Sequence, residues 1–232
     1  MINQNNAKNI RPPAVASMFY PVGAAELRKA VQNYLSNAGT EEDVSQFKKE
    51  EFAELRTLIV PHAGYIYSGK IAASAYRLLE QNKNQFKRVL LLGPAHRVLL
   101  EGAAFPEMDA FETPLGEITL DKELIEKILA EFSWISVSDK AHAEEHCLEV
   151  QLPFLQETLG EFKLLPLVVG DAKTELLAAL IQQFSKDHET LIVISTDLSH
   201  FHDYETAWEI DGRTANAIEL LEQNRISTED AC

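Results

Sequence analysis

The chain of 232 residues is 46% hydrophobic, which allows one large α/β domain or two small ones and argues against general disorder. Its formal net charge of −15 and its scattered basic residues argue against binding to nucleic acid or to an anionic membrane face. Cys147 and Cys232 are too few for a disulfide framework, and no apolar run approaches the ~20 residues of a membrane span, so we expect a soluble, cytoplasmic protein.

The N-terminal part of the chain begins with a polar stretch up to about residue 10, which we expect to be loose. Residues 11–21 (RPPAVASMFYP) contain too much proline for a helix and too many apolar side chains for a free tail, so we expect this segment to pack across the domain. Apolar residues at helical spacing predict a helix over residues 24–35. The polar stretch 36–51 that follows indicates a surface excursion.

The rest of the chain alternates between two kinds of pattern. Short runs rich in leucine or β-branched residues predict buried strands at 57–60, 88–92, 162–169 and 190–195. Helical spacing predicts helices at 69–80, 122–131, 146–159, 175–184 and 204–222. This alternation predicts a largely parallel sheet that is covered on both faces, with ligand sites beyond the carboxyl ends of the strands.

No repeat, low-complexity tract or flexible linker divides the sequence. Residues 106–116 indicate a loop or a small hairpin and not a domain boundary. We therefore expect a single domain over residues 1–232. No heptad pattern or apolar stripe indicates an oligomeric state.

Three of the predicted strands are followed by a histidine, in the segments PHAGY (61–65), GPAH (93–96) and TDLSH (196–200). Proline and glycine beside His62 and His96 favour a turn at the point where each strand leaves the sheet. We therefore expect His62, His96 and His200 to face one polar pocket, which could hold a divalent metal ion. Ser195 and Ser199 are candidates for a nucleophile only because they lie near these histidines in the sequence.

A further cluster of polar residues occupies positions 142–149 (HAEEHCLE). Acidic residues suit the N-terminus of a helix, and this is the role expected for Glu144 and Glu149. Glu145 and His146 either belong to the same helix start or reach the pocket, where a carboxylate would orient a ligating imidazole. Cys147 fits a small buried residue. The remaining histidines, His142, His188 and His202, are expected at the surface or at helix caps.

Five segments in this order resemble the Memo family, also called system protein B of the AmmeMemoRadiSam set. The resemblance spans nearly the whole chain and rests on RPPAVASMFYP at 11–21, PHAGYIYSG at 61–69, GPAH at 93–96, EEHCLE at 144–149 and STDLSH at 195–200. It implies a three-layer α/β/α sandwich around a mostly parallel or mixed sheet, similar to the catalytic subunits of class III extradiol dioxygenases.

The same resemblance implies roles for individual residues. His62, His96 and Cys232 would be metal ligands, His200 would be an acid/base histidine, and Asp197 and Glu145 would line the pocket. A thiolate would then replace the carboxylate of the two-histidine, one-carboxylate triad of the dioxygenases, which use non-haem Fe(II). Such softer coordination would favour copper or a redox role, so the expected cofactor is Fe(II) or copper.

The sequence departs from the family pattern at two places. Ser17 stands where the family usually has glycine. Family members also continue past the cysteine into a short segment and a final strand, whereas this chain stops at Cys232, so we expect it to lack that last segment.

Three functions fit these residues. The first is a metal-dependent oxidoreductase of the dioxygenase type, in which His200 moves a proton. The second is a non-catalytic module that uses a vestigial pocket to bind a small molecule or a peptide. The third, metal-assisted hydrolysis, ranks last because hydrolytic zinc sites commonly lack a cysteine at this place.

Overall fold

The computed structural model describes residues 8–39, 55–82, 85–184, 186–227 and 230–232. Most of the polar stretches expected to be loose or on the surface, at 1–10 and 36–51, lie outside the described residues. The chain divides into two compact units, residues 1–195 and residues 196–232, and each is described by itself. The expectation of a single domain over 1–232 stays a prediction.

The first unit is built on a six-stranded sheet with the order β2-β9-β3-β8-β4-β7. All neighbouring strands run parallel except β4 and β8, which are antiparallel, so the sheet is mixed. The strands are β2 (Thr57–Val60), β9 (Thr190–Ser195), β3 (Arg88–Pro94), β8 (Lys163–Val169), β4 (Ala103–Phe105) and β7 (Ile135–Val137).

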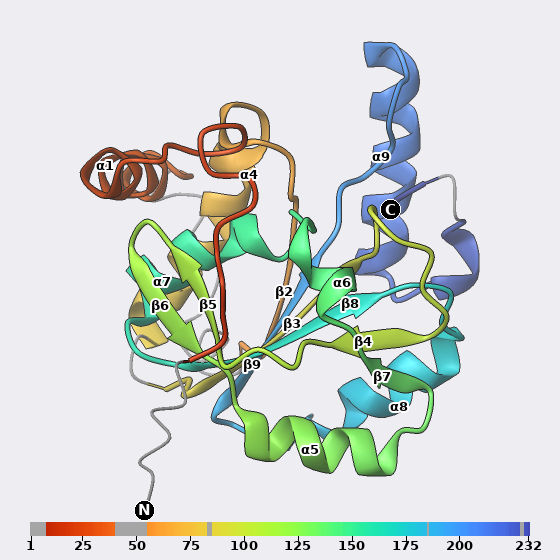
Figure 1. Ribbon diagram of the computed structural model, residues 1–232. Coiled ribbons are helices and arrows are strands. Elements are labelled where there is room, and N and C mark those ends of the chain that lie inside the picture. The colour runs from red at the N-terminus through yellow and green to blue at the C-terminus, as the bar shows by residue number, and fades with distance from the viewer. Residues whose placement is uncertain (1–7, 40–54, 83–84, 185, 228–229) are drawn as a thin grey trace, which may run out of the picture. The chain divides into compact units, whose positions relative to one another are not determined.

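Helices cover both faces of this sheet, as the near-continuous burial of its central strands requires. On one face lie α1 (Ala24–Ser36), α4 (Tyr65–Tyr76) and α7 (Leu152–Leu159), and on the other lie α5 (Lys122–Glu131) and α8 (Thr174–Gln183) (Figure 1). This is the expected three-layer α/β/α arrangement. None of the helices in the described residues combines the length and apolar character needed to cross a membrane.

A smaller sheet pairs β1 (Ile10–Arg11) with β5 (Ala110–Thr113), which forms a hairpin with β6 (Gly116–Thr119). Of the loop or small hairpin expected for residues 106–116, the structure has the hairpin. The N-terminal segment from Arg11 onward is packed into the unit, since Arg11, Val15 and Tyr20 are each at most 4% exposed. The expectation that residues 11–21 pack across the domain is therefore confirmed.

The segment between β7 and α7 differs from the helix expected over 146–159. A short helix, α6 (Asp139–Ala143), begins at Ser138, whose side chain accepts a hydrogen bond from the backbone N–H of Ala141. An irregular stretch follows, and helical structure resumes with the 3₁₀ helix Glu149–Gln151 and then α7. The irregular stretch, residues 144–148, is called the histidine loop below.

The second unit contains α9 (Tyr204–Glu219) and the 3₁₀ helix Gln223–Arg225. Asp203 caps α9, because its carboxylate accepts hydrogen bonds from the backbone N–H groups of Glu205 and Thr206. The helix expected at 204–222 therefore begins at the predicted residue and ends three residues earlier.

Candidate functional site

The histidines that follow β2 and β3 lie side by side. His62 comes two residues after the end of β2, and His96 comes two residues after the end of β3. Both strands run parallel to β9, which lies between them, so their carboxyl ends meet at one edge of the sheet. The ring centroids of His62 and His96 are 5.1 Å apart. The sequence-based expectation that these two imidazoles converge is confirmed.

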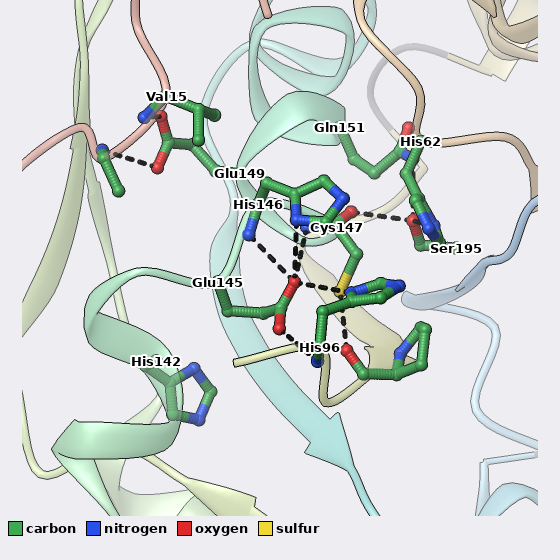
Figure 2. A network of polar contacts seen from close by, with 12 residues as sticks. Val15, His62, His96, His142, Glu145, His146, Cys147, Glu149, Gln151 and Ser195 are labelled. Carbon is green, nitrogen blue, oxygen red and sulfur yellow. Dashed lines mark hydrogen bonds and ion pairs between the residues drawn. The ribbon is translucent and has the colours of Figure 1, made fainter. Parts of the chain in front are cut away.

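A third imidazole comes from the histidine loop. The ring centroid of His146 is 4.6 Å from that of His96 and 5.4 Å from that of His62. Phe19, from the packed N-terminal segment, lies against its ring at a centroid distance of 4.8 Å. Figure 2 shows the His146 ring above the carboxylate of Glu145, the His96 ring beside that carboxylate, and His62 next to these two histidines. Of the two alternatives for His146, the structure favours the one in which it reaches the site.

The Glu145 carboxylate accepts hydrogen bonds from the residues around it. Its Oε2 accepts the backbone N–H of His96 at 2.7 Å, and its Oε1 accepts the backbone N–H groups of His146 at 2.9 Å and Cys147 at 3.1 Å. The His96 ring donates from Nδ1 to Oε1 at 2.9 Å. Glu145 therefore joins the histidine loop to the end of β3.

These contacts decide the charge of Glu145. Burial alone would raise the pKa of this carboxyl group, but the nearby His146 ring, 3.2 Å away, the hydrogen bond from the His96 ring and the hydrogen bonds from backbone N–H groups outweigh burial and hold its pKa well below the ordinary value. An ionised carboxylate can only accept hydrogen bonds, so His96 must carry its proton on Nδ1 in the neutral state. Its Nε2 then carries the lone pair that a metal ion requires.

Side chains of metal-binding type gather around Glu145. Within the first unit, one ligand atom each of His96, Glu145 and His146 lie within 4.8 Å of one another. The oxygens of Glu145 already accept four hydrogen bonds, so its geometry suits a residue that orients imidazoles better than one that ligates a metal. The catalytic role expected for Glu145 stays a prediction.

The small side chains of Gly93 and Cys147 allow the histidine loop to pack closely against the end of β3. A Cβ atom on Gly93 would lie 2.6 Å from the Sγ of Cys147, a distance that no well-packed structure tolerates. The buried Cys147 thiol donates to the carbonyl oxygen of Pro94 at 3.2 Å. Cys147 is therefore the small buried residue that its sequence context indicates, and Gly93 is required by this close packing.

The other predicted site residues belong to the second unit, where they lie close together. The backbone N–H of Asp197 donates to the Sγ of Cys232 at 3.3 Å, and the backbone N–H of Cys232 donates to the carbonyl oxygen of Asp197 at 3.2 Å. His200 Nε2 is 3.7 Å from a carboxylate oxygen of Asp197. The roles of Asp197, His200 and Cys232, like the ligand roles of His62 and His96, stay predictions.

Glu149 has a larger role than the helix-start residue expected from the sequence. It is fully buried and accepts hydrogen bonds from the Arg11 guanidinium at 2.6 Å, from the Tyr20 hydroxyl at 2.5 Å and from the backbone N–H groups of Ala14 and Val15. Desolvation and the neighbouring Glu149 carboxylate raise the pKa of Tyr20, so its hydroxyl stays a donor. Only a carboxylate, with its two oxygens, can accept all these hydrogen bonds. The spacing of residues along the chain does not reveal this role, because the donors are far from Glu149 in the sequence.

His142 is expected at the surface or at a helix cap, and both expectations are wrong. Its side chain is buried at 1% exposure, and its Nε2 donates to the carbonyl oxygen of Ala104 at 2.9 Å. The cause lies in α6, a short helix whose inner face packs against β4. His188 and His202 are exposed as expected.

Comparisons with known proteins agree with the motifs. The family model for Memo-like proteins matches residues 11–229. A MEMO1 family protein of Methanobrevibacter smithii is 35% identical over 229 residues, which cover 95% of this chain and 80% of that protein. A MEMO1 family protein of Aquifex aeolicus is 38% identical over 216 residues, covering 91% of this chain and 75% of the relative. One from Sulfolobus acidocaldarius is 33% identical, with 92% and 78% covered.

Proposed function

Because this chain belongs to the family of Memo-like proteins, we propose that it is a metal-dependent oxidoreductase that resembles the extradiol dioxygenases. His62 and His96 would hold Fe(II) or copper. This activity goes beyond what family membership establishes. The substrate of the enzyme would be a small organic molecule such as a catechol.

The observation that carries this proposal is the pairing of His62 with His96 beside a buried carboxylate. Imidazoles whose Nδ1 is held by a hydrogen bond present Nε2 to a metal ion in a defined direction. For His96 that partner is Glu145, at 2.9 Å. Two neutral imidazoles suit iron and copper equally, so the donor set fits the expected cofactor without choosing between them.

When bound, the metal supplies the one-electron chemistry that reactions of dioxygen need. Glu145 keeps His96 in the ligating tautomer, and His200, 3.7 Å from Asp197, would take a proton from the substrate hydroxyl. On the family resemblance alone, Cys232 stays the proposed third ligand. A thiolate there would stabilise copper more strongly than a carboxylate would.

Oxygen uptake tests this function. Metal-loaded wild type is expected to consume dioxygen when a catechol is added, and His62→Ala should abolish that uptake. His200→Ala should lower turnover while it retains the metal, since His200 is assigned to proton transfer. His188→Ala, a change at an exposed histidine, serves as the control. Uptake by wild type that His62→Ala leaves unchanged would refute the proposed site.

A second candidate function is a non-catalytic module that binds a ligand or a peptide. It is favoured by the exposed apolar side chains that follow His62 at the start of α4, because Ile66 and Tyr67 are 80% and 79% exposed. Metal-free protein would then keep its binding activity. Ligand binding that persists after chelation, together with no oxygen uptake under any metal loading, would favour this module over the enzyme.

A further inference from the structure

The hydroxyl group of Ser195 lies beside His62 and is surrounded by hydrogen-bonding groups. Gln151 donates from Nε2 to Ser195 Oγ at 2.8 Å, and Ser195 Oγ donates to the carbonyl oxygen of Cys147 at 2.7 Å. The Nδ1 atom of His62 is 3.2 Å from the same Oγ. All three side chains are at most 2% exposed, so these contacts are shielded from water. Figure 2 shows Gln151, Ser195 and His62 next to one another.

The chemistry of a hydroxyl group determines the direction of each contact. A serine has one hydrogen to donate and two lone pairs that accept. The carbonyl oxygen of Cys147 can only accept, so it takes the single hydrogen of Ser195. The amide of Gln151 uses one lone pair, and the other lone pair faces His62. Nδ1 of His62 must therefore be the donor, and Nε2 carries the lone pair of the neutral ring.

The amide of Gln151 is itself held in one orientation. Its Nε2 also donates to the carbonyl oxygen of Pro61 at 2.9 Å, and its Oε1 accepts the hydroxyl hydrogen of Tyr76 at 2.9 Å. If the amide were reversed, Oε1 would face the carbonyl oxygen of Pro61, and two acceptors would repel each other without water to separate them. The donor of Gln151 consequently always points at Ser195.

We propose that Ser195 is a positioning residue that sets the tautomer of His62. The Gln151 donor keeps the hydroxyl hydrogen from pointing at Gln151, and the carbonyl oxygen of Cys147 opposes a rotation in which the hydroxyl would donate to Nδ1, because that carbonyl oxygen would then face a lone pair. With Ser195 in place, His62 keeps its hydrogen on Nδ1 and directs the Nε2 lone pair to a cation. This role rests on the proposed metal function, although the tautomer itself exists without a metal.

Nitrogen NMR of metal-free protein at pH 8 tests the proposal, because long-range ¹H–¹⁵N correlations distinguish the two imidazole tautomers. His62 of wild type should show a single Nδ1–H form. Ser195→Ala, which removes the acceptor of Nδ1, should give a mixture with the Nε2–H form. Zn²⁺, a redox-silent probe, should bind this variant about 10- to 100-fold more weakly, the usual effect of losing a partner behind a metal-binding histidine.

Two variants control for the loss of a buried hydrogen bond. Tyr65→Phe removes a hydroxyl that donates to the carbonyl oxygen of Val150 at 2.8 Å and does not touch Ser195. Tyr76→Phe removes the donor to Gln151 Oε1, but Pro61 still opposes reversal of the amide. Both variants should lose stability to a similar extent as Ser195→Ala while His62 remains in the Nδ1–H form.

A wild-type His62 in the Nε2–H form, or a Ser195→Ala protein that keeps only the Nδ1–H form, would overturn the proposal. If Ser195→Ala does not fold, Ser195→Cys tests the same contact, since a thiol is a weak acceptor and should also produce a mixture. A wild type that binds no Zn²⁺, iron or copper would refute the proposed metal function, whereas the NMR result would still decide the role of Ser195.

Discussion

Ser17 adopts a left-handed backbone conformation, with φ of 68°. A residue with a Cβ atom rarely adopts this conformation, which costs about 1–2 kcal/mol, whereas glycine adopts it freely. The turn is held by the hydrogen bond from the Ser17 backbone N–H to the carbonyl oxygen of Tyr20 at 2.8 Å. The glycine usual at this position of the family thus has a structural explanation.

Ser17→Gly should therefore raise the free energy of unfolding, by up to about 1 kcal/mol after the greater freedom of glycine in the unfolded chain is counted. Urea denaturation measures the change. Ser17→Ala is the matched control, because it keeps the Cβ atom and should bring no gain. Equal stabilisation by both substitutions would show that backbone strain is not the cause.

The burial of His142 makes stability depend on pH. Desolvation is the main reason that its pKa falls from 6.5 to about 4, and the nearby charge of Arg11 acts in the same direction. The unfolded chain therefore binds a proton more readily than the folded chain does, so this contribution to stability is present above pH 6.5 and is lost as the pH falls toward 4.

From pH 7.5 to pH 5.0 the His142 contribution should fall by about 2 kcal/mol, as the two pKa values imply. Urea denaturation at both pH values should show that loss in wild type. In His142→Gln, the difference between the two pH values should shrink by the same amount. An unchanged pH dependence in the variant would mean that His142 is not the titrating group.

At the scale of elements, a buried ion pair joins the N-terminal segment to the 3₁₀ helix that follows the histidine loop. Arg11 and Glu149 are 1% and 0% exposed at their side chains. The same guanidinium donates to the carbonyl oxygens of His142 and Glu145, at 2.6 Å and 2.7 Å. Since Glu145 orients His96, Arg11 supports the site although it lies outside it.

Removing one partner of this pair leaves a buried charge without compensation. Glu149→Gln should lower the free energy of unfolding by about 3–5 kcal/mol. Lys8→Met provides the comparison, because Lys8 and Glu117 form an exposed ion pair at 3.0 Å whose loss should cost at most about 1 kcal/mol. Similar losses in urea denaturation for the two variants would contradict the importance assigned to the buried pair.

The elements that sequence reasoning located best are those with strong periodicity. The strands at 57–60 and 190–195 and the helix at 122–131 match the structure at both ends. The missed strands β1, β4 and β7 contain two or three residues each and carry no measurable alternation. The helix expected over 146–159 begins later, because the backbone N–H groups of His146 and Cys147 bind the Glu145 side chain.

At the scale of the whole molecule, topology explains which parts of the site were predictable. His62 and His96 follow parallel strands, so their meeting follows from a general rule of α/β sheets. The contributions of Gln151, Ser195 and Glu149 depend on contacts between segments far apart in sequence, for which a single chain gives no signal. The net charge of −15 attracts cations to the protein in general, but it does not determine where a cation binds.

The most direct test of the account is the metal content of protein purified without oxygen or chelator. Elemental analysis should find iron or copper in a stoichiometric amount in wild type and in His188→Ala, whose changed histidine is exposed. The metal should be absent from His62→Ala, which removes one of the two paired imidazoles. The same metal content in His62→Ala as in wild type, or no metal in any of the three proteins, would contradict the proposed metal site.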